Sequence, residues 1–208
     1  MRKMVTVSAA VAMFAGSACA QTLSEQISVQ KAPSVQEQTV NGSLLRTVED
    51  MFYLCAPKQG FLVSTPMGVD SLMAVRTGSG YQVRADIYGD EGKDLKLAMK
   101  ISSGKDGHRL EGSGIRLELK PVSGNGGKYA VTGKAGDENI NLSMSYWILG
   151  TEPTYIKVSG KGVSLDFNHS GNPGGEIKGS AAVSNKTLAA VISIVLAFYN
   201  DDPSFGDI

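Results

Sequence analysis

NKTLAAVISIVLAFYNDD, residues 185–202, predicts an α-helix that is apolar on every side. Between Leu188 and Tyr199 the only polar side chain is Ser193. A helix on a protein surface keeps one polar face, whereas a helix that is apolar all round is buried all round. We therefore expect a helix over residues 185–200 that forms the centre of the domain.

This helix is too short to cross a bilayer. About fourteen helical residues rise roughly 21 Å, which is less than the roughly 30 Å of the hydrocarbon core. A side-chain oxygen of Asn185 or Ser184 can cap its first turn, and Pro203 stops it. We expect no integral membrane span in the mature chain.

Most of the chain from Gly60 to the helix alternates apolar and polar residues with a period of two. Examples are GYQVRADIYG, KDLKLAMKIS, GIRLELKPV and ENINLSMSYW. This alternation indicates antiparallel strands with one buried face, and the intervening clusters of Gly, Asp and Asn are typical of hairpin turns. We count nine to eleven strands. The fold class predicted is mainly β, a closed antiparallel β-meander barrel with the hydrophobic C-terminal helix buried inside.

A second helix is predicted near the start of the domain. LLRTVEDMFYLC, residues 44–55, carries apolar residues at a spacing that fits one helical face. We expect a short helix that ends before Pro57, with a strand as the alternative.

The N-terminal residues predict export. Residues 1–20 combine a basic start, an apolar run and small residues before Ala20, which is typical of a bacterial secretory signal. Cleavage after Ala20 would make the protein periplasmic or secreted. The alternative is a lipoprotein anchored through Cys19. Residues 21–43 have the composition of a flexible leader with, at most, a transient strand, and residues 44–205 form the single barrel domain.

The charge balance argues against a nucleic-acid partner, and the cysteine content leaves one thiol in the processed chain. The full chain has 20 basic and 20 acidic residues, and loss of Arg2 and Lys3 with the signal leaves 18 against 20, a net charge of −2. Nucleic-acid binding requires a basic stripe, so we expect no nucleic-acid partner. Cys55 is then the only thiol and is expected to be a small buried hydrophobe; a reactive or intermolecularly paired thiol is the alternative.

No cluster of residues predicts a chemistry. A cysteine nucleophile needs a base, but His108 and His169 both lie in glycine-rich turn sequence. The glycines of residues 169–176 lack the Gly-Lys-Ser/Thr of a phosphate loop. Trp147 is either an aromatic platform for a ligand or a strand-end residue that packs over the barrel mouth. The densest acidic stretch surrounds a hairpin turn rather than a calcium loop and consists of Asp86, Asp90, Glu91 and Asp94.

A β-meander that ends in a hydrophobic helix of the form LAAVISIVLAFYND resembles the tubby C-terminal-like superfamily. That superfamily includes the LURP-one-related proteins and the phospholipid scramblases. The resemblance covers roughly residues 50–205 and implies a closed barrel of about twelve strands threaded by a C-terminal helix. The basic side chains with which some members bind phosphoinositides map onto no position of this chain. The calcium site, palmitoylated cysteines and proline-rich leader of the scramblases are absent from the sequence.

These observations predict an exported, non-enzymatic binding or envelope-associated interaction module. Its partner would be an envelope protein or a lipid. One alternative is a periplasmic carrier that holds a lipid or small apolar ligand in a hollow barrel. Another is an exported enzyme with a carboxylate pair assembled from distant strands. We assign no catalytic, metal, cofactor-binding or ligand-binding residue, and no cofactor, from the sequence.

Overall fold

The computed structural model describes residues 36–40, 43–56, 58–64, 69–88, 94–123, 127–149, 152–169 and 174–201. The predicted signal at residues 1–20, including Cys19 and Ala20, lies outside this part of the chain. So do residues 21–35 of the predicted leader and residues 202–205 of the predicted domain.

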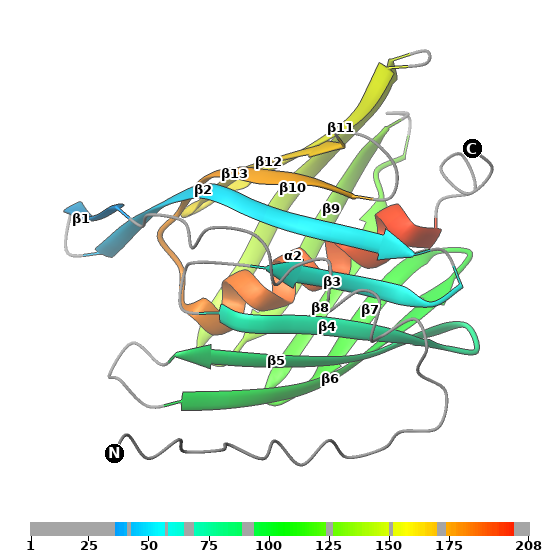
Figure 1. Ribbon diagram of the computed structural model, residues 1–208, viewed down its shortest axis with the longest axis horizontal. Helices are drawn as coiled ribbons and strands as arrows, with labels where there is room; N and C mark the ends of the chain where they lie inside the picture. The colour runs from blue at the N-terminus through cyan, green and yellow to red at the C-terminus, as the bar shows by residue number, and fades with distance from the viewer. Residues whose placement is uncertain are drawn as a thin grey trace, which may run out of the picture. The chain divides into compact units, whose positions relative to one another are not determined.

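Within the described residues the chain forms thirteen strands followed by one helix (Figure 1). The elements are β1 Gln36–Val40, β2 Ser43–Ala56, β3 Gly60–Ser64, β4 Val69–Thr77, β5 Gly80–Tyr88, β6 Asp94–Gly104, β7 Gly107–Gly112, β8 Ile115–Pro121, β9 Lys128–Ala135, β10 Glu138–Leu149, β11 Glu152–Gly160, β12 Val163–His169, β13 Gly174–Ala181 and α2 Asn185–Asp201.

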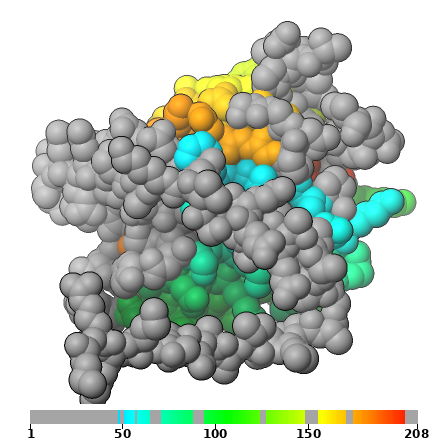
Figure 2. Space-filling view, in the orientation of Figure 1, coloured from blue at the N-terminus to red at the C-terminus, as the bar shows by residue number. Residues whose placement is uncertain are grey.

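Twelve of the strands close into an antiparallel barrel. Each strand from β2 to β13 pairs with its neighbours in sequence, and β2 also pairs with β13, which completes the ring. Strand β1 pairs with β2 outside the ring. Figure 2 views the wall from outside, with atoms of β13 (orange) beside those of β2 (cyan). The predicted barrel is therefore confirmed, although the predicted count of nine to eleven strands is too low.

Strand β2 corrects the prediction of a helix over residues 44–55. The register between β13 and β2 shifts between Val48 and Met51, so that these two residues both face inward three positions apart. Beyond the shift, Tyr53 and Cys55 continue the inward set at a spacing of two. A bulge that inserts an extra residue in this way produces apolar spacing that resembles a helical face. Pairing on both edges makes the segment a strand.

Strand β1 lies inside the predicted leader. Residues 36–40 pair with residues 43–47 of β2 in an antiparallel hairpin. The composition of this stretch predicts, at most, a transient strand. The strand forms because β2 provides the edge with which it pairs, and composition does not reveal that edge.

Helix α2 fills the barrel (Figure 1). Every side chain from Thr187 to Asn200 is buried, and the helix packs against strands β2 to β9. The one polar side chain in its apolar stretch, Ser193, donates a hydrogen bond from Oγ to the Ala189 carbonyl at 2.7 Å. The predicted buried helix is confirmed, and it runs one residue further than expected. In the described part of the chain, no helix has the length and apolarity needed to cross a membrane.

The inner faces of the strands supply the rest of the core. The predicted alternation places Tyr81, Val83, Ala85 and Ile87 of β5 inside, each no more than 2% exposed. Glycines allow the wall to bend: Gly133 has a φ of 139°, and a Cβ there would lie 2.0 Å from a backbone oxygen of the neighbouring strand. Positions of this kind curve a sheet into a barrel.

We predict that a charge in the centre of α2 unfolds the domain. Ile194 is fully buried, so Ile194→Asp would place an unpaired carboxylate in the core, at a cost comparable to the roughly 5–15 kcal/mol of total stability of a typical protein. The cooperative thermal transition followed by circular dichroism should disappear. The control at the same position, Ile194→Val, should cost only about 0.5–1.5 kcal/mol. An Ile194→Asp protein that melts cooperatively near the wild-type temperature would contradict the buried position of the helix.

Candidate functional site

The C-terminal end of α2 forms a buried polar cluster at one mouth of the barrel. The Asp201 carboxylate accepts hydrogen bonds from the guanidinium of Arg76, at the end of β4, and from the hydroxyl of Tyr81, near the start of β5. Arg76 also donates to the Tyr81 oxygen at 2.8 Å, and the amide nitrogen of Asn200 donates to the same oxygen at 3.1 Å. Burial, together with the hydrogen bond to Asp201, raises the pKa of Tyr81, which therefore stays protonated. We call Arg76, Tyr81, Asn200 and Asp201 the mouth cluster.

His108 adjoins the mouth cluster from β7. Its Nδ1 lies 3.0 Å from Ser103 Oγ and 3.8 Å from Asp201 Oδ2, and its ring meets Phe198 edge-on at 6.0 Å. Burial lowers the pKa of His108 despite the opposing effect of Asp201, so the neutral ring is favoured. In a catalytic triad the hydroxyl and the carboxylate occupy opposite ring nitrogens. Here both face Nδ1, so these three groups do not form a proton relay.

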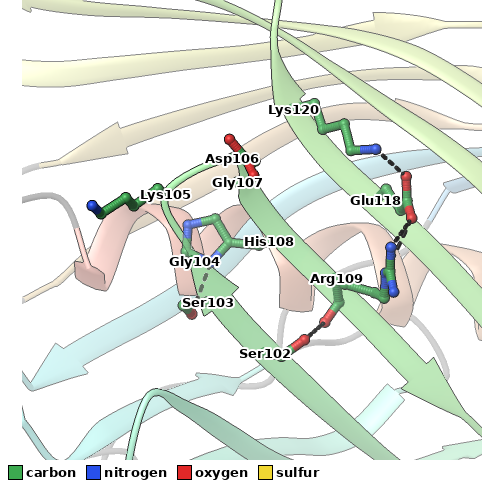
Figure 3. Close-up of a pocket in the computed structure, with 10 residues that line it drawn as sticks. All are labelled: Ser102, Ser103, Gly104, Lys105, Asp106, Gly107, His108, Arg109, Glu118 and Lys120. Atoms are coloured by element: carbon green, nitrogen blue, oxygen red, sulfur yellow. Dashed lines mark hydrogen bonds and ion pairs between the residues drawn. The ribbon is translucent and has the colours of Figure 1, made fainter.

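A small pocket opens beside His108 at the β6–β7 hairpin (Figure 3). Its volume is about 220 Å³. Within it, Arg109 and Lys120 both bind Glu118, with nitrogen–oxygen distances of 2.6 Å. These two cations, Lys120 first, hold the pKa of Glu118 below its ordinary value. Arg109 and Lys120 are both engaged by Glu118, and the rest of the pocket lining combines hydroxyl and backbone groups with the side chains of Lys105, Asp106 and His108. Its lining consists of Ser102, Ser103, Gly104, Lys105, Asp106, Gly107, His108, Arg109, Glu118 and Lys120.

His169 also contacts the helix. The Tyr199 hydroxyl lies 2.6 Å from His169 Nδ1, and the Tyr199 ring meets Tyr53 edge-on at 5.8 Å. Burial lowers the pKa of His169. The sequence places both histidines in turns without partners; in the structure they lie in strands, and each contacts the last residues of α2.

Cys55 is buried, as predicted. Its side chain faces the barrel interior with 4% exposure, and burial raises the pKa of its thiol. A protonated thiol in this position is a packing group rather than a nucleophile.

The N-terminal end of α2 is held by a second carboxylate. Ser184 is the N-cap: the Thr187 backbone N–H donates to Ser184 Oγ at 3.2 Å. Glu138, at the start of β10, accepts hydrogen bonds from the Ser184 hydroxyl at 2.7 Å and from the Thr187 hydroxyl. A carboxylate at this end also interacts favourably with the helix dipole. A groove of about 530 Å³ borders it, lined by Asp137, Glu138, Asn139, Ile140, Leu142, Lys161, Gly162, Val163, Ala182 and Val183.

The remaining predicted positions lie apart from these clusters. Trp147 is on the outer face of β10, 45% exposed, with its ring against that of Tyr155 on β11. Of the acidic stretch, Asp86 lies in β5 and Asp94 in β6, whereas Asp90 and Glu91 fall outside the described residues. Among the residues that the structure describes, no three His, Cys, Asp or Glu side chains are placed to hold a metal ion.

Comparison of the chain with protein-family models, with curated proteins and with solved structures found no match. The geometry itself indicates what the polar clusters do. Both carboxylates bind the ends of α2 to the barrel wall, so the mouth cluster and Glu138 fix the helix along the barrel axis.

We predict that the mouth cluster stabilises the domain more than a surface ion pair does. Arg76→Met would leave the Asp201 carboxylate, 13% exposed, without its cation, at a cost of about 1–3 kcal/mol in the free energy of unfolding. The matched control Arg109→Met removes a more exposed pair and should cost less than Arg76→Met does. Urea denaturation measures both.

Asp201→Asn in the Arg76→Met background should recover part of the loss, because a neutral amide does not require a cation. Equal costs for Arg76→Met and Arg109→Met would contradict a stabilising role for the mouth cluster.

Proposed function

We propose that this protein is an exported, non-enzymatic binding module that contacts a component of the cell envelope through the outside of its barrel wall. The observation that carries this proposal is the burial of α2, whose side chains from Thr187 to Asn200 occupy the barrel interior. A partner that entered the barrel would have to displace this helix. The predicted signal at residues 1–20 supports export.

The filled interior favours a surface module over a carrier. A carrier needs an apolar cavity large enough for its ligand. In this barrel, apolar side chains such as Leu188 and Ile194 lie against the inward-facing residues of the strands. The pocket beside His108 and the groove beside Glu138 lie at the ends of the helix and carry charged side chains.

The two carboxylates at the ends of α2 are not placed to act as a hydrolytic pair. Hydrolysis by a carboxylate pair requires the two groups to lie about 5–10 Å apart. Glu138 and Asp201 bind opposite ends of a helix of 17 residues, which is about 25 Å long. Each is engaged in holding the helix.

The architecture also supports a distant relationship to the tubby C-terminal-like superfamily. We propose it because a ring of twelve strands around a C-terminal helix has the arrangement that the resemblance implies. The relationship would concern the fold, since no basic pocket of the phosphoinositide-binding members maps onto this chain.

The test combines native mass spectrometry with envelope sedimentation. The secreted, mature protein should have a native mass without a lipid adduct, and it should co-sediment with isolated bacterial envelopes in a saturable manner that unlabelled protein competes. A bound lipid that leaves on addition of an apolar competitor would favour the carrier instead. Failure to sediment with envelopes at any concentration would contradict the proposal.

A further inference from the structure

An aromatic pair lies on the outer face of β10 and β11, with Trp147 exposed and Tyr155 half-buried. Trp147 and Tyr155 face each other across the two strands, with ring centroids 5.6 Å apart and ring planes tilted by 40°. The Trp147 side chain faces outward because its neighbour Tyr146 packs inward against Phe198. An exposed ring that lies against a second ring offers an apolar surface with a polar edge on which a ligand can pack.

The Tyr155 ring is fixed in position before any ligand arrives. Its hydroxyl is hydrogen-bonded to the carboxylate of Asp166 on β12, and burial together with this bond raises the pKa of Tyr155 to about 12. Asp166 Oδ1 in turn lies 3.9 Å from Lys157 Nζ. An aromatic group with one end tied down loses little conformational entropy on binding.

Strand register extends this pair into a row. Trp147, Tyr155, Asn168 and Glu176 are successive partners across β10, β11, β12 and β13. All four lie on the outer face, since the neighbouring residues Ile156, Phe167 and Ile177 are buried in the core. We call these four residues the aromatic row. At about 4.8 Å between strands it is about 14 Å long, with two rings at one end and an amide and a carboxylate beyond them.

A row of hydroxyl groups runs parallel to the aromatic row. Ser143, Ser159, Ser164 and Ser180 are successive partners on the same four strands and the same outer face. The residues between the two rows carry paired charges, such as Lys178, which contacts Glu176 at 2.7 Å. The face therefore combines short hydroxyl side chains, one aromatic pair and no unpaired excess of charge.

We propose that this face binds an uncharged, extended carbohydrate chain. Sugar rings present C–H groups on their faces, which pack on aromatic rings such as Trp147 and Tyr155, and hydroxyl groups on their edges, which hydrogen-bond to amides, carboxylates and serines. The inference rests on the proposed function, because it identifies the envelope component that the outer wall contacts.

Two other ligand classes fit this face less well. A protein interface has a continuous apolar centre, whereas the Trp147–Tyr155 pair is separated from the next aromatic residue of this outer face, Phe52 on β2, by two polar positions of the row. A phosphate or anionic lipid surface needs free cations, but Lys157 and Lys178 each lie beside a carboxylate, those of Asp166 and Glu176.

Trp147 is the only tryptophan of the chain, so its fluorescence reports directly on this face. The secreted full-length protein is titrated with chitotetraose, cellotetraose and maltotetraose and with the corresponding monosaccharides. We expect at least one tetrasaccharide to give a saturable change in emission at a lower concentration than its monosaccharide. Tyr155→Ala, which keeps the reporter, should weaken that affinity at least tenfold, whereas the control Met73→Ala on β4 should leave it unchanged.

Thermal melts separate binding from a structural role. If Tyr155 served only as a cross-strand packing partner, Tyr155→Ala would lower the melting temperature and leave the affinity for the sugar unaltered, and that result would overturn the inference. A flat titration up to about 10 mM of every tetrasaccharide would also overturn it. If the protein then still sediments with envelopes, the binding module stands and only its carbohydrate ligand is wrong; if it does not, the proposed function fails as well.

Discussion

Strands around the whole barrel turn their apolar residues toward the same helix. α2 has no polar face, so it is stable only where apolar groups surround it, and a closed ring of antiparallel strands provides that environment. The dependence is mutual, because a ring of twelve strands without the helix would enclose an apolar space that the inner side chains alone do not fill. Helix and barrel are therefore one core.

The polar groups at the two ends follow from this arrangement. Polar groups at the two ends of a buried helix need hydrogen-bond partners in the wall. At the first turn of α2 the partner is Glu138 of the wall, and at the last turn Asp201 of the helix binds Arg76 of the wall. These carboxylates, and the two histidines that contact the end of α2, are used for holding the helix. The groups that we propose for binding lie on the outer wall, in the aromatic row and the serine residues beside it.

Much of the fold could be predicted because its signals are local. The unbroken apolar run from Leu188 to Tyr199 and the period of two in the strands each fix an element without distant information. β2 was predicted wrongly because its bulge between Val48 and Met51 imitates helical spacing, and only pairing on both edges identifies it as a strand. The mouth cluster joins Arg76 to Asp201 across 125 residues, which no local pattern reveals. The sequence indicates Trp147 as a possible aromatic platform for a ligand. Its neighbours on β11 to β13 could not be predicted, because they are set by the register between strands.

The most direct test of a helix-filled barrel is the thermal melt of the chain ended after Ser184, compared with the chain that keeps α2 and followed by near-ultraviolet circular dichroism. Without α2 the strands lose the surface on which their apolar faces pack, so the account predicts loss of the cooperative transition and of the near-ultraviolet signal of the buried tyrosines. A shortened chain that keeps both, with a melting temperature close to that of the chain with α2, would show that the barrel stands without the helix and would contradict the account.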